Sequence, residues 1–318
     1  MARGDEPAPR AVRLTRDAAG GTVGRVTPWP AIDEPLLRER FAMPDDDFWR
    51  FYARLMSNVG PRPYEDATLA HAFGYPWDRP VGSYRLEADE VSLLADLPAA
   101  ERERTIAAYS GPTAGRLPML AIGSNGAPAT LRLKFAHFDA PADRDVLALA
   151  GQLHDFDVGP SAHLAPYGSL PATVFASPGT AVRSAVLWLT QAQFVQLTWS
   201  EVPYRLGRLE ARFAGDEPGT DAGAVLLFAS RSGVQAPDGT PLALSAVPAA
   251  RRTAPALSQQ DALDAVARSA LGPEGDAEAL VRRVFADFGA WAASDAAAQL
   301  RATGRPLATE RFTSFPAG

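Results

Sequence analysis

The chain has 318 residues, of which 47% are apolar and 21% charged, a balance typical of a soluble globular protein rather than a disordered or fibrous one. Its 31 basic and 37 acidic residues give a net charge of −6, which argues against a nucleic-acid partner because phosphate backbones are bound by basic surfaces. Since there is no cysteine, disulfides, thiol nucleophiles and cysteine-ligated metal centres are excluded. With no apolar signal core at its start and no stretch of about 18 uncharged apolar residues, we expect a cytoplasmic protein without a membrane partner.

The N-terminal part of the sequence predicts an arm followed by an amphipathic helix. Residues 1–25 lack apolar periodicity, which predicts a disordered arm. Across residues 48–56 the apolar side chains recur at helical spacing, and three aspartates at 45–47 precede them at the positive end of the predicted helix. Three adjacent carboxylates could also form a metal site, but we interpret them as helix-capping residues.

The next segments predict irregular structure and then two helices. Proline, glycine and aromatic residues dominate residues 60–85, where we expect an irregular segment that covers a surface. Helices are predicted over residues 88–97 and 99–109, with Pro98 at the start of the second. A run of breaker residues at 110–115 marks the main boundary of the chain.

Beyond this boundary the sequence becomes rich in β-forming residues. Strands are predicted over residues 117–122, 172–175, 182–189, 224–229 and 242–247. We expect a turn at residues 177–180 between the second and third of these strands. Thr190 and Gln193 have the spacing of a capping box that opens a short helix. Two more helices are predicted, one over residues 258–271 and one beginning at Asp276.

A Gly-Ser-Asn turn directly after the first predicted strand is a candidate binding element. Gly123, Ser124 and Asn125 can present successive backbone N–H groups to a carboxylate or an oxyanion, because glycine permits close approach and unusual dihedral angles. The same tripeptide also occurs in ordinary turns. Glu201 follows some 75 residues later with Tyr204 close behind, and a solvated carboxylate at a helix end is the alternative interpretation of Glu201.

In their order along the chain, these segments resemble those of the γ-glutamyl cyclotransferase-like proteins. The run Leu120–Gly126 is similar to the Tyr-Gly-Ser-Asn-Leu signature of that family. Four later segments of this chain resemble later segments of the family in the same order, namely residues 167–179, 182–189, 194–204 and 224–229. The resemblance covers about residues 115–248, which is under half of the chain.

The resemblance implies an α+β fold, built on a small mixed β-barrel with added N-terminal and C-terminal helices. The expected parts are a disordered arm at 1–25, a helical region at 26–112, the barrel at 113–248 and C-terminal helices at 249–318. The region before the barrel carries two aromatic clusters, Phe48–Tyr52 and Tyr75–Trp77, which we expect to pack against the barrel.

The resemblance also implies an activity and assigns roles to residues. Glu201 takes the place of the family's acid/base, and the turn from Gly123 through Ser124 to Asn125 takes that of its substrate-binding loop. Ile122 and Tyr204 are expected to line the pocket. In the implied reaction, the α-amine of a γ-glutamyl amide attacks its own γ-carbonyl, which releases 5-oxoproline and an amine. The expected partner is therefore a small molecule, and neither a cofactor nor a metal is needed.

Departures from the family pattern leave other functions open. Ile122 stands where the family has an aromatic residue and Gly126 where it has leucine, so a different substrate or a lost activity is compatible with the sequence. One alternative is a catalytically silent protein that binds a small acid or amide, and another is an assembly or interaction protein. An intact carboxylate beside the turn favours the enzyme, whereas a salt bridge that engages Glu201 favours the alternatives. The sequence predicts no oligomeric state.

Other polar clusters are weaker candidates. His154, Asp155 and Asp157, with His137 nearby, could ligate a metal, but their alternation with apolar residues is typical of an edge strand. A Ser-His-Asp triad lacks the Gly-x-Ser-x-Gly motif that would position its nucleophile. Arg132 and Lys134 could contact an anionic substrate, although we favour solvated charges on an alternating strand or a turn.

Overall fold

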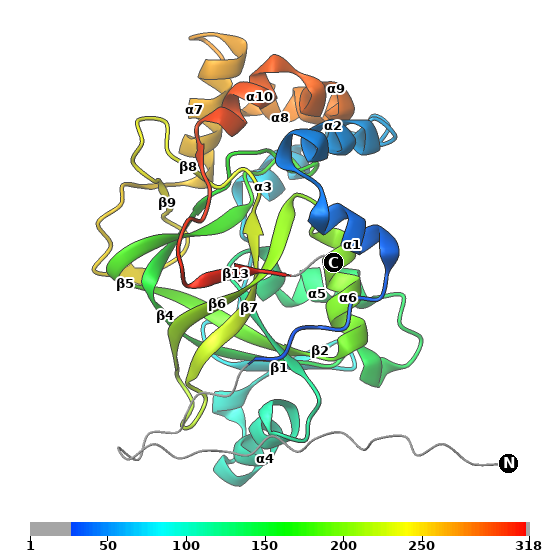
Figure 1. Cartoon of the computed structure of the whole chain (residues 1–318), viewed down its shortest axis with the longest axis vertical. Helices are drawn as coiled ribbons and strands as arrows, with labels where there is room; N and C mark the ends of the chain where they lie inside the picture. The colour runs from blue at the N-terminus through cyan, green and yellow to red at the C-terminus, as the bar shows by residue number, and fades with distance from the viewer. Residues whose placement is uncertain (1–26, 316–318) are drawn as a thin grey trace, which may run out of the picture.

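A closed barrel of five strands forms the centre of the structure, a computed structural model that describes residues 27–315 (Figure 1). The barrel strands are β3 (Leu117–Ala121), β4 (Val146–Pro160), β5 (Ala172–Leu189), β6 (Tyr204–Gly215) and β7 (Ala222–Ser230). They pair in the closed order β4–β5–β3–β7–β6–β4, in which β3–β7 is parallel and the other four pairs are antiparallel. The predicted α+β fold with a small mixed β-barrel is therefore confirmed. The arm predicted at residues 1–25 lies outside the described residues.

Both faces of the barrel strands are buried, which explains their long apolar runs. Along β7, Val225 and Leu227 belong to one hydrophobic core, while Leu226 and Phe228 belong to another, because side chains alternate between the faces of a strand. The second core includes side chains from α5 (Pro128–Phe135) and α6 (Gln191–Ser200), so these two helices cover that face. Residues 132–134 thus belong to a helix, and their prediction as part of a strand or turn is wrong.

Two predicted helix ends are confirmed in detail. Thr190 is the N-cap of α6, where its side chain accepts from the Gln193 N–H and the Gln193 side chain accepts from the Thr190 N–H. Ser258 is the N-cap of α7 (Gln259–Leu271), which ends at Gly272 with a φ of 100°. Because α6 begins where the capping box places it, its last turn delivers Glu201 to the position described below.

The aspartates before residue 48 act differently from the predicted caps. They occupy the first turn of α2 (Asp45–Met56), whose N-cap is Pro44 with no side-chain cap. Asp45 instead pairs with Arg231 at 3.0 Å and with Arg205 at 2.6 Å, so it joins the start of α2 to the barrel. The guanidinium of Arg231 is buried and also donates to the Met43 carbonyl oxygen at 2.9 Å.

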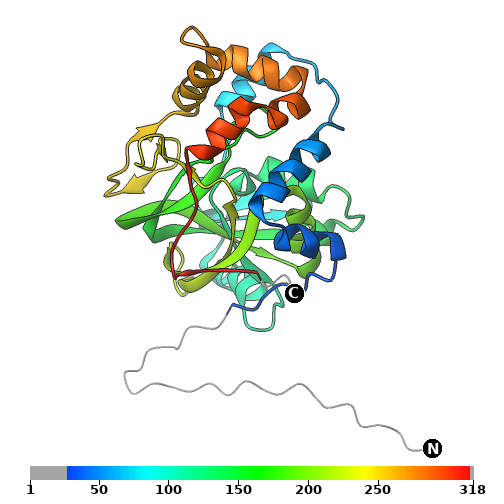
Figure 2. The same ribbon diagram turned by 45° about the horizontal axis from the view of Figure 1, so that its top comes forward.

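The two aromatic clusters of the N-terminal region have different partners. Phe48 and Tyr52 of α2 share a core with Phe288 and Trp291 of α9 (Phe288–Ala293). This cluster also contacts the barrel region, because the Arg231 guanidinium after β7 lies 4.2 Å from the Phe48 ring centroid. In both views α2 lies beside these helices, while α4 (Ala99–Ser110) lies at the opposite end of the molecule (Figure 1, Figure 2). Tyr75, in contrast, belongs to a barrel core.

The helix predicted over residues 88–97 is wrong, because these residues form part of a hairpin. Strands β1 (Tyr84–Glu87) and β2 (Glu90–Leu93) are joined by two residues whose φ angles, 47° at Ala88 and 66° at Asp89, are both positive. A two-residue turn of this kind reverses the chain, although Ala88, Glu90 and Leu93 favour helices. The hairpin extends the barrel sheet through the β1–β4 pair.

Three further expectations need correction. The predicted turn at 177–180 lies within the continuous strand β5, as an irregularity opposite residues 154–156 of β4. The irregular segment at 60–85 contains the helix α3 (Asp66–Phe73), and the strand at 242–247 shortens to β9 (Ala243–Leu244).

The remaining helices are α1 (Pro35–Ala42), α8 (Ala277–Ala286), α10 (Asp295–Ala302) and the 3₁₀ turns η1 (Leu94–Asp96), η2 (Ser124–Gly126) and η3 (Pro141–Arg144). The remaining strands are β8 (Val234–Gln235), β10 (Ala249–Ala250), β11 (Ala256–Leu257), β12 (Gly304–Arg305) and β13 (Phe312–Ser314). Among the described residues, no helix combines the length and the apolar character needed to cross a bilayer.

A chain that begins at Thr113 should be insoluble, or should melt at a much lower temperature than the full chain. It lacks the hairpin strand that pairs with β4 and the α2 side chains that fill the core of the C-terminal helices. Circular dichroism and differential scanning fluorimetry on both chains measure the difference. A soluble chain that melts cooperatively near the temperature of the full chain would contradict this prediction.

Candidate active site

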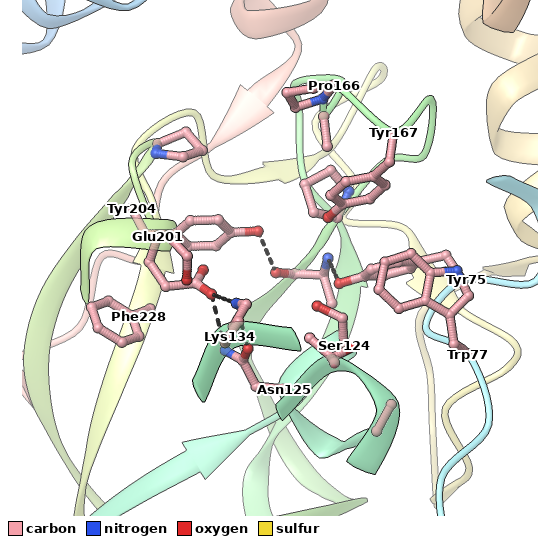
Figure 3. Close-up of a pocket in the computed structure, with 18 of the residues that line it drawn as sticks. Tyr75, Trp77, Ser124, Asn125, Lys134, Pro166, Tyr167, Glu201, Tyr204 and Phe228 are labelled. Carbon is pink, nitrogen blue, oxygen red and sulfur yellow. Dashed lines mark hydrogen bonds and ion pairs between the residues drawn. The ribbon is translucent and has the colours of Figure 1, made fainter. Parts of the chain in front are cut away.

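A cavity of about 830 Å³ opens where the chain leaves β3 and where α6 runs into β6. Its walls come from the turn at 123–125, from α5, from the segment 199–204, from the loop at 163–172 and from residues 71–78 of the N-terminal region. All six residues proposed from the sequence line it, which are Ile122, Gly123, Ser124, Asn125, Glu201 and Tyr204. The barrel, its helices and the N-terminal region therefore all contribute to one cavity (Figure 3).

Three polar side chains meet at one end of the cavity. The Asn125 side-chain amide donates to Glu201 Oε1 at 3.0 Å, and the Lys134 ammonium donates to the same oxygen at 2.8 Å. Lys134 also donates to Asn125 Oδ1 at 2.7 Å, which closes a triangle (Figure 3). The structure thus brings the predicted turn and the predicted carboxylate together, and it adds a lysine that we expected to be solvated. We call Asn125, Lys134 and Glu201 the polar triad.

Local structure explains why these three side chains converge. Glu201 is the C-cap of α6, Asn125 lies in η2 directly after β3, and Lys134 lies in the last turn of α5. Arg40 of α1 donates to the Thr198 carbonyl oxygen at 2.8 Å and so holds the end of α6. Only 18% of the Lys134 side chain and 12% of the Glu201 side chain are exposed, so their ion pair is less screened by solvent than a surface pair.

Aromatic rings form the other end of the cavity. Trp77 lies 5.4 Å from Tyr75 and 5.2 Å from Tyr167, measured between ring centroids, and the two tyrosine rings lie 6.1 Å apart. Figure 3 shows these rings across the cavity from the polar triad. We did not assign these three residues to the site from the sequence. The only signal was the aromatic pair 75 and 77 within a segment rich in proline and glycine.

Two tyrosine hydroxyls hold the peptide groups of Ala172, at the start of β5. The Ala172 N–H donates to the Tyr75 hydroxyl oxygen at 2.8 Å, and the Tyr204 hydroxyl donates to the Ala172 carbonyl oxygen at 3.0 Å. Tyr204 therefore contributes its ring to the cavity wall, while its hydroxyl proton is engaged by the backbone. Burial raises the pKa of Tyr75 to about 12 and raises the pKa of Tyr204 well above its usual value, so both hydroxyls keep their protons at neutral pH.

The backbone at Gly123 passes very close to Tyr75. A Cβ atom on Gly123 would collide with the Tyr75 hydroxyl oxygen and would lie 3.2 Å from the Ala172 Cβ. Glycine is required here because of this close approach. The hydroxyl of Tyr75 thus occupies the space in front of the turn that we expected a ligand to occupy.

The two positions that depart from the family signature also have structural explanations. Ile122 is 6% exposed and packs in the same core as Tyr75. A Cβ atom on Gly126 would lie 2.8 Å from Arg79 Cδ, so glycine leaves room for the Arg79 side chain. Arg79 in turn donates to the Ile122 carbonyl oxygen at 3.3 Å. Both departures therefore accommodate residues of the N-terminal region.

The two aspartates of the predicted histidine and aspartate cluster bind other groups of the protein. Arg252 binds both carboxylate oxygens of the buried Asp157, at 2.7 and 2.8 Å, and Asp155 accepts from the Gly179 N–H. Within residues 27–315, no three His, Asp or Glu side chains are grouped as a metal site would require. His163 lines the cavity with its Nδ1 3.0 Å from Ser232 Oγ, and burial lowers its pKa to about 3.

Comparison with known proteins adds a weak similarity of fold. A solved structure described as a gamma-glutamyl cyclotransferase is similar over 36% of this chain and 66% of that protein, with 20% sequence identity and a TM-score of 0.26. The matched part thus spans just under two thirds of that protein. No family model matches the sequence, and no curated protein matches it.

Gly123→Ala should lower the free energy of unfolding by roughly 1–3 kcal/mol, because the added methyl group meets the Tyr75 hydroxyl. In a Tyr75→Phe background, Gly123→Ala should lower the free energy of unfolding by a smaller amount, since the colliding oxygen is absent. Urea denaturation of the four proteins in this double-mutant cycle measures the coupling. Gly82→Ala is the control, because nothing lies within 4 Å of its Cβ position. Equal costs in both backgrounds would show that Tyr75 is not the obstacle.

His163 should make the protein less stable in acid. Its ordinary pKa of 6.5 applies in the unfolded chain, whereas burial holds it near 3 in the folded protein, so only the unfolded chain takes up the proton between these values. The contribution of His163 is therefore complete above pH 6.5 and falls by up to about 1.4 kcal/mol per pH unit as the pH drops toward 3. Urea denaturation at several pH values should show a shallower decline for His163→Gln. The exposed His137, changed in the same way, should leave the decline unchanged.

Proposed function

We propose that the protein catalyses the intramolecular aminolysis of a γ-glutamyl amide, which releases 5-oxoproline and an amine. The observation that carries this proposal is the Glu201 carboxylate, placed beside the Gly-Ser-Asn turn at the polar end of an open cavity. The order of the matching segments along the sequence supports the same reaction.

The ion pair of the polar triad suits the head group of such a substrate. A γ-glutamyl group carries an α-ammonium and an α-carboxylate on one carbon atom. Glu201 and Lys134 offer the complementary charges 2.8 Å apart, so a substrate can bind by exchanging partners, with its ammonium on Glu201 and its carboxylate on Lys134. Asn125 keeps Glu201 oriented during this exchange through its side-chain amide.

The proposed chemistry needs one carboxylate that moves a proton. Glu201 accepts a proton from the α-ammonium, and the freed amine attacks the γ-carbonyl carbon to close a five-membered ring. The amide C–N bond then breaks as Glu201 gives this proton to the departing nitrogen, and the second proton of the ring nitrogen passes through Glu201 to the released amine, which leaves as an ammonium ion. Because both reacting groups belong to one molecule, holding the folded-back conformer supplies much of the acceleration.

The aromatic end of the cavity is suited to the amine portion of the substrate. A γ-glutamyl group fills only a fraction of about 830 Å³, and the remaining walls include Tyr75, Trp77 and Tyr167. Flat apolar walls of this kind bind apolar groups through burial and ring contacts. We therefore propose that the released amine carries an apolar or aromatic part.

A second candidate is a catalytically silent protein that binds an amino acid or a related acid. The ion pair between Lys134 and Glu201 favours this candidate, because it engages the carboxylate that the reaction needs. Such a protein would bind L-glutamate or 5-oxoproline and release no amine from any γ-glutamyl amide. Calorimetric binding and product analysis on the same preparation separate the two candidates.

Glu201→Gln should lower kcat by roughly 10²–10⁴, because the amide keeps the shape of the side chain but neither accepts nor returns a proton. The affinity for substrate should change less, and the melting temperature should stay within a few degrees. The measurement is 5-oxoproline formed from a panel of γ-glutamyl amides, quantified by mass spectrometry. Glu103→Gln, on the exposed side of α4, is the matched control with unchanged kcat. Full turnover by a folded Glu201→Gln protein would contradict the mechanism.

A further inference from the structure

The hydroxyl of Tyr75 lies at the junction of the two ends of the cavity. Its oxygen accepts the Ala172 N–H at 2.8 Å and lies against Gly123, where a Cβ atom would collide with it. The side chain is 3% exposed and lines the cavity. The turn after β3 and the start of β5 therefore fix the position of this oxygen, although Tyr75 itself belongs to the segment before the barrel (Figure 3).

The Tyr75 hydroxyl has a proton that takes part in no hydrogen bond within the described residues. Within residues 27–315, no acceptor receives a hydrogen bond from the Tyr75 hydroxyl, which takes part only as an acceptor. Other buried tyrosines of this region differ, since Tyr204 donates to the Ala172 carbonyl oxygen and Tyr84 donates to the Gly126 carbonyl oxygen, each at 3.0 Å. A buried donor without a hydrogen-bond partner destabilises the folded protein. The Tyr75 hydroxyl is therefore suited to donate a hydrogen bond to an acceptor on a ligand that enters the cavity.

The surroundings make the hydroxyl a good donor that stays protonated. Burial raises the pKa of Tyr75 to about 12, while the N–H groups of Ala172 and Ser124 act in the opposite direction. The proton is thus retained at neutral pH, and a hydroxyl that accepts hydrogen bonds becomes a stronger donor in turn. The charge of Glu201 also raises the pKa of Tyr75, which agrees with both groups facing the same space.

We propose that Tyr75 is a catalytic residue whose hydroxyl donates a hydrogen bond to the γ-carbonyl oxygen of the amide and stabilises the oxyanion formed on attack. This inference rests on the proposed function. The amine attacks from the side of Glu201, the negative charge develops on the oxygen that faces Tyr75, and the proton of Tyr75 stays on its own oxygen throughout.

The proposal changes the role of the Gly-Ser-Asn turn. We expected its N–H groups to contact the ligand directly, whereas here the turn and the Ala172 N–H hold a hydroxyl that makes the contact. A side chain from outside the barrel would thereby complete the oxyanion site. The amine portion then lies toward Trp77 and Tyr167, next to the same tyrosine.

The test compares Tyr75→Phe with the wild-type chain on γ-glutamyl-p-nitroanilide and on γ-glutamyl amides of aliphatic and aromatic amines, with 5-oxoproline measured by mass spectrometry. Loss of one oxyanion donor should lower kcat by about 10²-fold, with KM within a few-fold of wild type. Tyr109→Phe, far from the cavity on α4, is the matched control and should keep full activity.

A second measurement separates a catalytic hydroxyl from a structural one. A fluorinated tyrosine at position 75 keeps the ring and the oxygen but loses its proton at lower pH, so the alkaline decline of kcat should move to lower pH. An unshifted decline, or a folded Tyr75→Phe protein with unchanged kcat, would overturn this inference and leave the proposed function intact. Absence of 5-oxoproline from every amide with the wild-type chain would overturn the proposed function and this inference together.

Discussion

The missing side chain at Gly123 is the constraint on which the arrangement of the cavity depends. It lets the Tyr75 hydroxyl reach the backbone at the end of β3, and the same hydroxyl accepts from Ala172 at the start of β5. A segment far from both strands in sequence is thereby fixed to the barrel at one point. The neighbouring rings of Trp77 and Tyr167 pack against Tyr75 and complete the wall. A methyl group at position 123 would force the Tyr75 hydroxyl to move.

Charge balance shapes the opposite end of the cavity. A carboxylate with only 12% of its side chain exposed needs compensation, and Glu201 receives it from an ammonium and an amide. The compensation comes from two short elements, η2 and α5, that follow one another directly after β3. One connection of the chain thus supplies both partners of the carboxylate, while the capping box of α6 sets where the carboxylate lies.

Features with local causes could be predicted from the sequence. The capping boxes at Thr190 and Ser258 and the apolar spacing of α2 depend on neighbouring residues or on a recurring pattern. The barrel strands β4 and β6 were not among the predicted strands, and the sequence did not predict the order in which the strands pair. The approach of Asn125 to Glu201 followed from the resemblance, since both motifs belong to one pattern.

Contacts between residues far apart in the sequence could not be predicted from such patterns. Lys134 looked solvated because nothing near it in sequence indicates that Glu201, 67 residues later, faces it. Asp45 looked like a cap because its partner Arg231 lies 186 residues away. The hairpin turn at Ala88 escaped notice because neither of its residues is glycine, although both have positive φ angles.

The polar and the aromatic walls of the cavity come from different parts of the chain. The polar triad lies on segments of the barrel region, whereas Tyr75 and Trp77 lie on a short stretch before it. Substitution at Trp77 therefore changes the aromatic wall of the cavity, while Glu201, Lys134 and Asn125 keep their mutual contacts. In the proposed reaction, substitutions in this stretch could exchange one leaving group for another while the proposed acid–base group stays in place.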